Sequence, residues 1–171
     1  MKKILLLILI AVASVNVQAQ DVYVAGNVSL WRNDDANKTA FTVSPEIGCN
    51  LDSSWALGVA LGYNYNYLKG LKTNAFSIAP YARYSYYNND KVRLFIDGGF
   101  GFSTLKTKGS DSTNGWEIGL KPGIAIKLNK NFSLLAKCGF VGYRDDYFTG
   151  EDGFGFSLNS EDISLGVHYE F

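Results

Sequence analysis

Few residues in this sequence are of the types that perform chemistry. His168 is the only histidine, and a general base in hydrolysis is most often a histidine within hydrogen-bond reach of its partners. Cys49 and Cys138 are the only cysteines and could form one disulfide in an oxidising compartment. The segment DDYFTGEDG, residues 145–153, is acidic but lacks the ligand spacing of a calcium loop. We therefore expect a solvated loop there, no metal site and no cofactor.

A second group consists of ionisable side chains within otherwise small and apolar segments: Glu46, Arg83, Asp97, Lys121 and Lys137. Charges in an interior with little water must be paired, because an unpaired buried charge costs several kcal/mol. Whether these five can pair depends on the elements that carry them.

Those elements are β-strands. Aromatic and β-branched runs alternate with clusters of Asn, Asp, Gly and Lys, and helical periodicity is almost absent. The pattern predicts eight strands, at residues 22–32, 39–51, 55–67, 74–88, 91–105, 114–128, 132–143 and 161–171. Tight turns at 51–54, 88–90 and 129–131 alternate with longer polar loops at 33–38, 69–73, 106–114 and 144–153. This alternation favours an all-β fold, an eight-stranded antiparallel up-and-down transmembrane β-barrel.

Each predicted strand has two unlike faces, except the strand at 22–32, whose faces are ambiguous. In the strand at 132–143, for example, the apolar face carries Phe132, Leu134, Ala136, Cys138 and Phe140. The other face of most strands is Gly, Ala, Ser and Asn, with Phe95 and Leu135 as apolar exceptions. A lipocalin-like soluble barrel or a sandwich would bury the apolar face instead. A water-facing surface should be rich in Lys and Glu, whereas small residues suit the crowded lumen of an eight-stranded barrel. We therefore expect lipid outside.

The first 19 residues predict a secretory signal peptide. Lys2 and Lys3 precede an apolar run, and Val17 and Ala19 occupy the −3 and −1 positions for cleavage before Gln20. The barrel would then comprise residues 20–171. The whole chain has 16 basic and 16 acidic residues, so it lacks the basic excess typical of a nucleic-acid-binding protein.

Four stretches carry a family resemblance: SPEIGCNLDSSWALGVALGYNY (44–65), APYARYSYY (79–87), LKPGIAIKL (120–128) and ISLGVHYEF (163–171). With the signal peptide, they make the chain similar to the small outer-membrane barrels of Gram-negative bacteria, the OmpX-like and OmpA-transmembrane-domain-like group. The resemblance implies an integral outer-membrane protein that contacts outer-membrane lipid and is inserted by the barrel-assembly machinery. In that group a terminal aromatic after alternating apolar residues is the assembly signal, which implies this role for Val167, Tyr169 and Phe171.

The barrel geometry places the ionisable residues in the lumen. All five lie five to seven residues from the short-turn ends of their strands and point inward. The tight turn at 88–90 sets Arg83 diagonally across from Asp97, and Lys121 is expected near Asp97 from the other side. An eight-stranded interior is only wide enough for side chains to fill. We therefore expect a plugged, non-conducting lumen.

The barrel geometry also gives expectations for the histidine, the two cysteines and the prolines. His168 faces the lumen, so we expect a structural polar contact and not an outward catalytic histidine. Cys49 and Cys138 lie three strand spacings apart and point to lipid, beyond disulfide reach, so we expect free thiols. Pro45, Pro80 and Pro122 fall inside strands, where proline cannot donate to the ladder, and bulges are the expected resolution.

The sequence thus favours a non-enzymatic membrane barrel with a structural or adhesive role through four extracellular loops, whose partner it does not name. Two alternatives stay open: a small outer-membrane enzyme acting on lipid, and a narrow pore.

Overall fold

The computed structural model describes residues 22–33, 38–68, 71–107, 109, 111–148, 152–157 and 164–171. The expected signal peptide lies outside these ranges. The strands are β1 (Val22–Asn33), β2 (Lys38–Asn50), β3 (Trp55–Leu68), β4 (Leu71–Asn88), β5 (Val92–Thr107), β6 (Ser112–Lys127), β7 (Phe132–Lys137), β8 (Phe140–Asp145), β9 (Gly153–Ser157) and β10 (Ser164–Glu170). Within the described ranges, no helix is long and apolar enough to cross a membrane.

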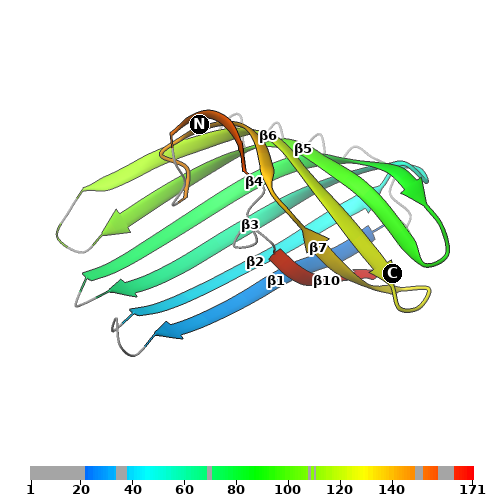
Figure 1. The fold of residues 1–171 in the computed structure, drawn as a ribbon, viewed down its shortest axis with the longest axis horizontal. Coiled ribbons are helices and arrows are strands. Elements are labelled where there is room, and N and C mark those ends of the chain that lie inside the picture. Colours follow the sequence, from blue (N-terminus) through cyan, green and yellow to red (C-terminus); the bar gives the residue numbers. More distant parts are fainter. Residues whose placement is uncertain are drawn as a thin grey trace.

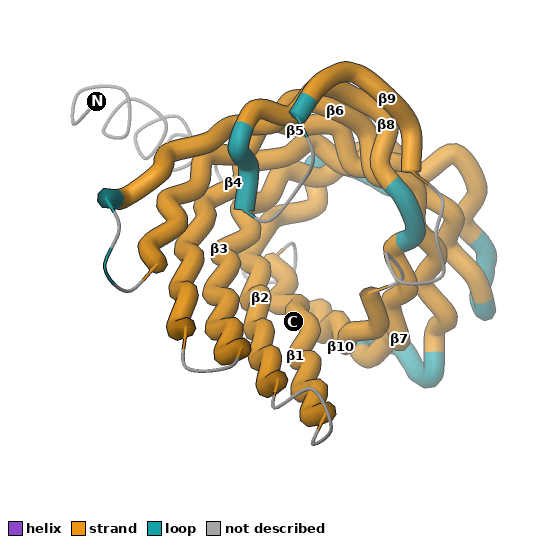
Figure 2. Tube along the Cα trace, turned by 60° about the vertical axis from the view of Figure 1, so that its left-hand side comes forward, coloured by secondary structure: helices purple, strands orange, loops and turns teal. Residues whose placement is uncertain are grey.

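These segments close into an eight-stranded antiparallel barrel, as the sequence predicts (Figures 1 and 2). Consecutive strands pair from β1 to β6, and β10 closes the ring by pairing with both β1 and β7. β7 and β8 pair with successive parts of β6 and together form the seventh strand of the wall. β9, which the sequence pattern did not predict, pairs with β8.

Each of the three short turns is closed by the side chain of one Asp or Asn. The acceptor is Asp52 in the β2–β3 turn, Asn89 in the β4–β5 turn and Asn129 in the β6–β7 turn. In each turn the side-chain Oδ1 accepts hydrogen bonds from the backbone N–H groups two and three residues further on. An Asx side chain substitutes in this way for a backbone acceptor, which explains the residue types at these tight turns.

A bulge at Cys138 and Gly139 separates β7 from β8. The pairing of β6 with β8 is shifted by one residue relative to its pairing with β7, and Gly139 has φ 74°, which glycine adopts readily. Because strand side chains alternate, a one-residue shift reverses the two faces. Phe140 therefore points inward and is buried. This corrects the outward position expected from an unbroken strand at 132–143.

The three prolines are accommodated in two ways. Pro122 lies opposite the bulge, and its carbonyl accepts a hydrogen bond from the N–H of Cys138 at 3.0 Å. Pro45 and Pro80 cause no register shift. The β2–β3 ladder skips Pro45 and the residue before it, the β4–β5 ladder skips Pro80 and the residue before it, and both resume in the same register. The expected bulge thus occurs at one proline only.

The outer face of the wall is apolar. Large hydrophobic side chains that are exposed there include Ile47, Leu57, Phe76, Phe102, Ile118, Leu120, Ile126 and Leu134. The buried apolar cluster is small by comparison, formed by Phe95, Ala125 and Leu135 with Ala25 against it. A soluble barrel would bury its large apolar side chains, so this distribution is that of a membrane barrel.

Candidate functional site

A buried ionic layer crosses the middle of the lumen. Arg83 on β4 lies directly opposite Asp97 on β5, and its Nε and Nη2 donate to the two Asp97 carboxylate oxygens at 2.7 and 2.9 Å. Lys137, on β7, donates to Glu46 Oε1 on β2 at 2.6 Å and lies 3.0 Å from Asp97 Oδ2. Four of the five ionisable residues named from the sequence are therefore together, with two acids and two bases.

Aromatic rings enclose the guanidinium of Arg83. Its Cζ lies 4.1 Å from the ring centroid of Phe95, 5.3 Å from that of Tyr81 and 5.7 Å from that of Tyr23. Tyr81 also donates its hydroxyl to Glu46 at 2.9 Å. Cation–π contacts of this kind are stronger where water is excluded, so the rings stabilise a charge that would otherwise be costly to bury.

Lys121 belongs to a second ionic layer, nearer the long-loop end. Its backbone pairs with Asp97, but its ammonium bonds Glu117 Oε1 at 2.5 Å, four residues back along β6. Arg144, on β8, donates its Nε to the other Glu117 oxygen at 2.9 Å and stacks on Phe140, with Cζ 3.8 Å from the ring centroid. The expected contact of Lys121 with Asp97 is thus replaced by a contact with Glu117.

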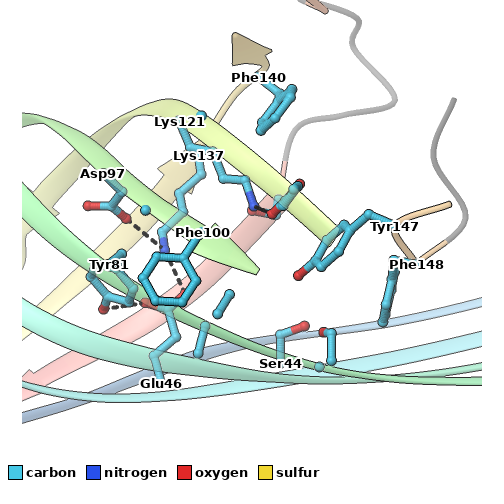
Figure 3. A pocket seen from close by; sticks show the side chains of 18 of the residues that line it. Ser44, Glu46, Tyr81, Asp97, Phe100, Lys121, Lys137, Phe140, Tyr147 and Phe148 are labelled. Carbon is cyan, nitrogen blue, oxygen red and sulfur yellow. Dashed lines mark hydrogen bonds and ion pairs between the residues drawn. The ribbon is translucent and has the colours of Figure 1, made fainter. Parts of the chain in front are cut away.

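The segment after β8 folds back into the barrel. Tyr147 is buried, and a Cβ added to Gly101 of β5 would lie 2.6 Å from its hydroxyl oxygen. The N–H of Phe148 donates to Ser103 Oγ at 2.7 Å. Asp146 and Phe148 both have positive φ, 49° and 61°, which is uncommon for residues other than glycine. Figure 3 shows both rings at one end of the lumen, with the middle layer at the other.

A cavity of about 420 Å³ occupies the lumen between these features. Its lining includes the acids and lysines of both layers, Phe140, Tyr147 and Phe148, and a wall of small residues from Ser44 to Gly139. The small-residue face that the sequence assigned to a crowded lumen therefore leaves a defined space beside the ionic groups.

His168 lies at the short-turn end of the lumen and is buried. Its Nε2 is 3.1 Å from Glu170 Oε1, which also accepts from Arg93 Nη1 at 2.9 Å. Its ring packs on Tyr23 with centroids 4.6 Å apart. The histidine thus has a polar contact inside the barrel, away from the lipid-facing surface.

The remaining candidates lie on the wall. Cys49 and Cys138 are free thiols. Val167, Tyr169 and Phe171 have exposed side chains, and the N–H of Phe171 donates to the Val22 carbonyl at 3.1 Å. The chain end is therefore attached to β1. Within the described ranges, no three His, Cys, Asp or Glu side chains are grouped to bind a metal ion.

Sequence reasoning missed Glu117, Arg144 and Tyr147. The sequence pattern is sufficient to identify Glu117, because it shares the inward face of its strand with Lys121. The sequence pattern predicts Arg144 in a loop, and the inward direction of its side chain depends on the bulge between β7 and β8. Tyr147 follows that strand in a segment without periodicity, so no local pattern indicated that it enters the lumen.

Residues 4–171 match the family described as outer membrane protein beta-barrel domain. The crystal structure of the N-terminal beta-barrel domain of Pseudomonas aeruginosa OprF is similar at 15% identity and a TM-score of 0.56, covering 89% of this chain and 98% of that one. Ail, the attachment invasion locus protein of Yersinia pestis, gives 15% identity and a TM-score of 0.44, covering 88% of this chain and 97% of that one. No curated protein matches the sequence.

Proposed function

Since the chain belongs to the outer membrane protein beta-barrel domain family, we propose that it is a non-enzymatic barrel whose lumen is plugged by its own side chains and whose loops act at the cell surface. The family places it in the outer membrane. The plug, the surface role and the absence of catalysis are the proposal.

The observation that carries the plug is the set of ion pairs that join distant strands across the lumen. Lys137 of β7 reaches Glu46 of β2, and Arg93 of β5 reaches Glu170 of β10. A conducting pore would present open water lined by charges of one sign. Here charges of both signs are paired, and the Arg83 guanidinium and its rings occupy the middle of the lumen.

Conductance tests the plug. The refolded wild-type protein in a planar bilayer is expected to give no steady single-channel current, under conditions in which a general porin reconstituted in parallel conducts. Steady currents from the wild-type protein would contradict the plug and favour the narrow-pore alternative.

The surface role is supported by the long-loop end of the wall. Described residues there are polar and exposed, among them Lys72, Asn74, Lys106 and Asn114. Cells that display variants with all four long connections shortened should adhere less to host cells or matrix than wild-type cells, with equal amounts of folded barrel. Equal adherence would contradict the surface role. A changed lipid A profile in a deletion strain would instead favour the enzyme alternative.

We also propose export through a cleaved signal peptide followed by insertion by the barrel-assembly machinery. Mass spectrometry of the protein isolated from outer membranes should then find an N-terminus at Gln20. An outer-membrane protein that retains residues 1–19 would contradict cleavage.

A further inference from the structure

The charged side chains around the lumen cavity differ in how much solvent they meet. The exposed fraction is 35% for the side chain of Lys121, 27% for Arg144 and 16% for Lys137. For the carboxylates that pair with them it is 3% for Glu117, 8% for Glu46 and 4% for Asp97. The cations and the carboxylates all line the cavity, but the side chains of the cations are the more solvent-exposed.

The pairing geometry explains this arrangement. Glu117 has one oxygen bonded to Lys121 and the other to Arg144, so both oxygens face their partners and neither is directed to open space. Lys137 lies between Glu46 and Asp97 in the same way. With Arg83 beside Asp97, the two layers contain four cations and three carboxylates. One positive charge is not balanced by an acid of these layers.

The surroundings suit a small ligand. About 420 Å³ is within the range of roughly 300–1,000 Å³ found for small-molecule sites. Ser44, Ser77, Asn27 and Ser164 supply polar groups to the lining, and Phe140 supplies an apolar surface beside Arg144. Figure 3 shows Lys121 and Lys137 extending into this space from neighbouring parts of the wall.

We propose that this cavity binds a small molecule through a carboxylate or phosphate oxyanion, with Lys121 and Arg144 as its principal contacts and Lys137 at its base. A guanidinium and two ammonium groups are the side chains that bind such oxyanions most strongly. The middle ionic layer lies on the short-turn side of the cavity, so the ligand enters from the long-loop end, past the rings of Tyr147 and Phe148. The oxyanion belongs either to a free solute or to a lipid headgroup.

Inorganic phosphate is the probe for this site. Calorimetric titration of the refolded mature chain in a nonionic detergent, at low chloride concentration, should give saturable binding. Lys121→Gln should weaken binding about tenfold, since one charge-assisted hydrogen bond is lost. Glu117→Gln should strengthen it, because a competing carboxylate is removed. The matched control is Lys106→Gln, which removes the same charge from an exposed position at the long-loop end and should leave binding unchanged.

Whether a substitution at Lys121 or Glu117 weakens or strengthens phosphate binding distinguishes a binding role of these residues from a packing role. Heat-modifiable migration on gels identifies variants that are folded. In wild-type protein, phosphate should shift the NMR signals of Lys121, Arg144 and Gly119, a readout that needs no variant. Absence of saturable binding, equal losses in Lys121→Gln and Lys106→Gln, or weaker binding in Glu117→Gln would each overturn the proposal.

A competition experiment distinguishes a free solute from a lipid headgroup as the source of the oxyanion. Displacement of phosphate by phosphatidic acid in the micelle, but not by phosphatidylcholine, supports a lipid headgroup as the natural ligand. Retention of phosphate in the presence of both lipids supports a free solute.

Discussion

Replacing Asp97 with alanine removes the acid to which Arg83 is bonded in the middle of the lumen. Arg83 is almost fully buried and donates two hydrogen bonds to Asp97, at 2.7 and 2.9 Å. Lys137 also loses a contact of 3.0 Å. The guanidinium cannot reach bulk water from this position, so the variant leaves a buried charge with much weaker pairing.

The size of the stability loss in Asp97→Ala depends on the contacts that Arg83 and Lys137 keep. Removing one partner of a buried ion pair costs about 3–5 kcal/mol. Arg83 keeps Glu46 Oε2 at 3.7 Å and the Phe95 ring at 4.1 Å, and Lys137 keeps Glu46. We therefore expect the lower end, a loss of about 3 kcal/mol in the free energy of unfolding. The double variant Arg83→Ala, Asp97→Ala should lose less stability than the sum of the two single variants. It removes both charges of the pair, so it leaves neither one buried without the other.

Urea unfolding of protein refolded into phospholipid vesicles, followed by tryptophan fluorescence, measures these free energies. Asp111→Ala is the control, since Asp111 is exposed at the long-loop end and should change stability little. Additive effects of the Arg83 and Asp97 substitutions, or an Asp97→Ala variant as stable as the control, would refute the pairing argument.

Three further measurements test the closure of the barrel, the role of Tyr169 and Phe171, and the close packing at Gly48. The closed barrel should resist SDS until heated and so migrate differently with and without boiling; a single unshifted band without a β-sheet circular dichroism signal would contradict the fold. Replacing Tyr169 and Phe171 together by serine should lower the amount assembled in the outer membrane without reducing export, and unchanged assembly would leave these residues as lipid-facing surface only. Gly48→Ala should destabilise the barrel by about 1–3 kcal/mol, because its Cβ would meet the ring of Tyr23. Gly155→Ala, whose Cβ meets nothing within 4 Å, should not, and equal stabilities would contradict this close packing.

Much of the wall could be predicted because it depends on local chemistry. Alternation with period two and the Asp or Asn residues of the tight turns specify strands and hairpins without long-range information. The pairing of Arg83 with Asp97 is nearly local as well, since one hairpin joins their strands. A bulge between Ser85 and Tyr87 shifts that hairpin by one residue and brings the two directly opposite. Without the bulge, the tight turn alone predicts a diagonal position for the two.

The contacts within the lumen were less predictable because they depend on closure of the ring. Lys137 on β7 meets Glu46 on β2 three strands away around the closed wall, and the shear of the barrel sets their relative height. With Asp97 already bonded to Arg83 and Lys137, Lys121 extends along its own strand to Glu117. Phe140 and Arg144 face inward only because a bulge reverses the alternation before them, and a bulge leaves no periodic signal.

The ion pairs across the lumen also affect the order of assembly. Glu46 and Lys137 are 91 residues apart in sequence, and Arg93 and Glu170 are 77 apart. In a curved but open sheet these groups would each be hydrated, and they meet only when β10 reaches β1. Closing the ring therefore creates the seam and the long-range pairs in a single step. An intermediate in which β10 has not yet paired with β1 has neither the seam nor the long-range ion pairs. The barrel should therefore form and unfold as one cooperative unit, without a stable open form.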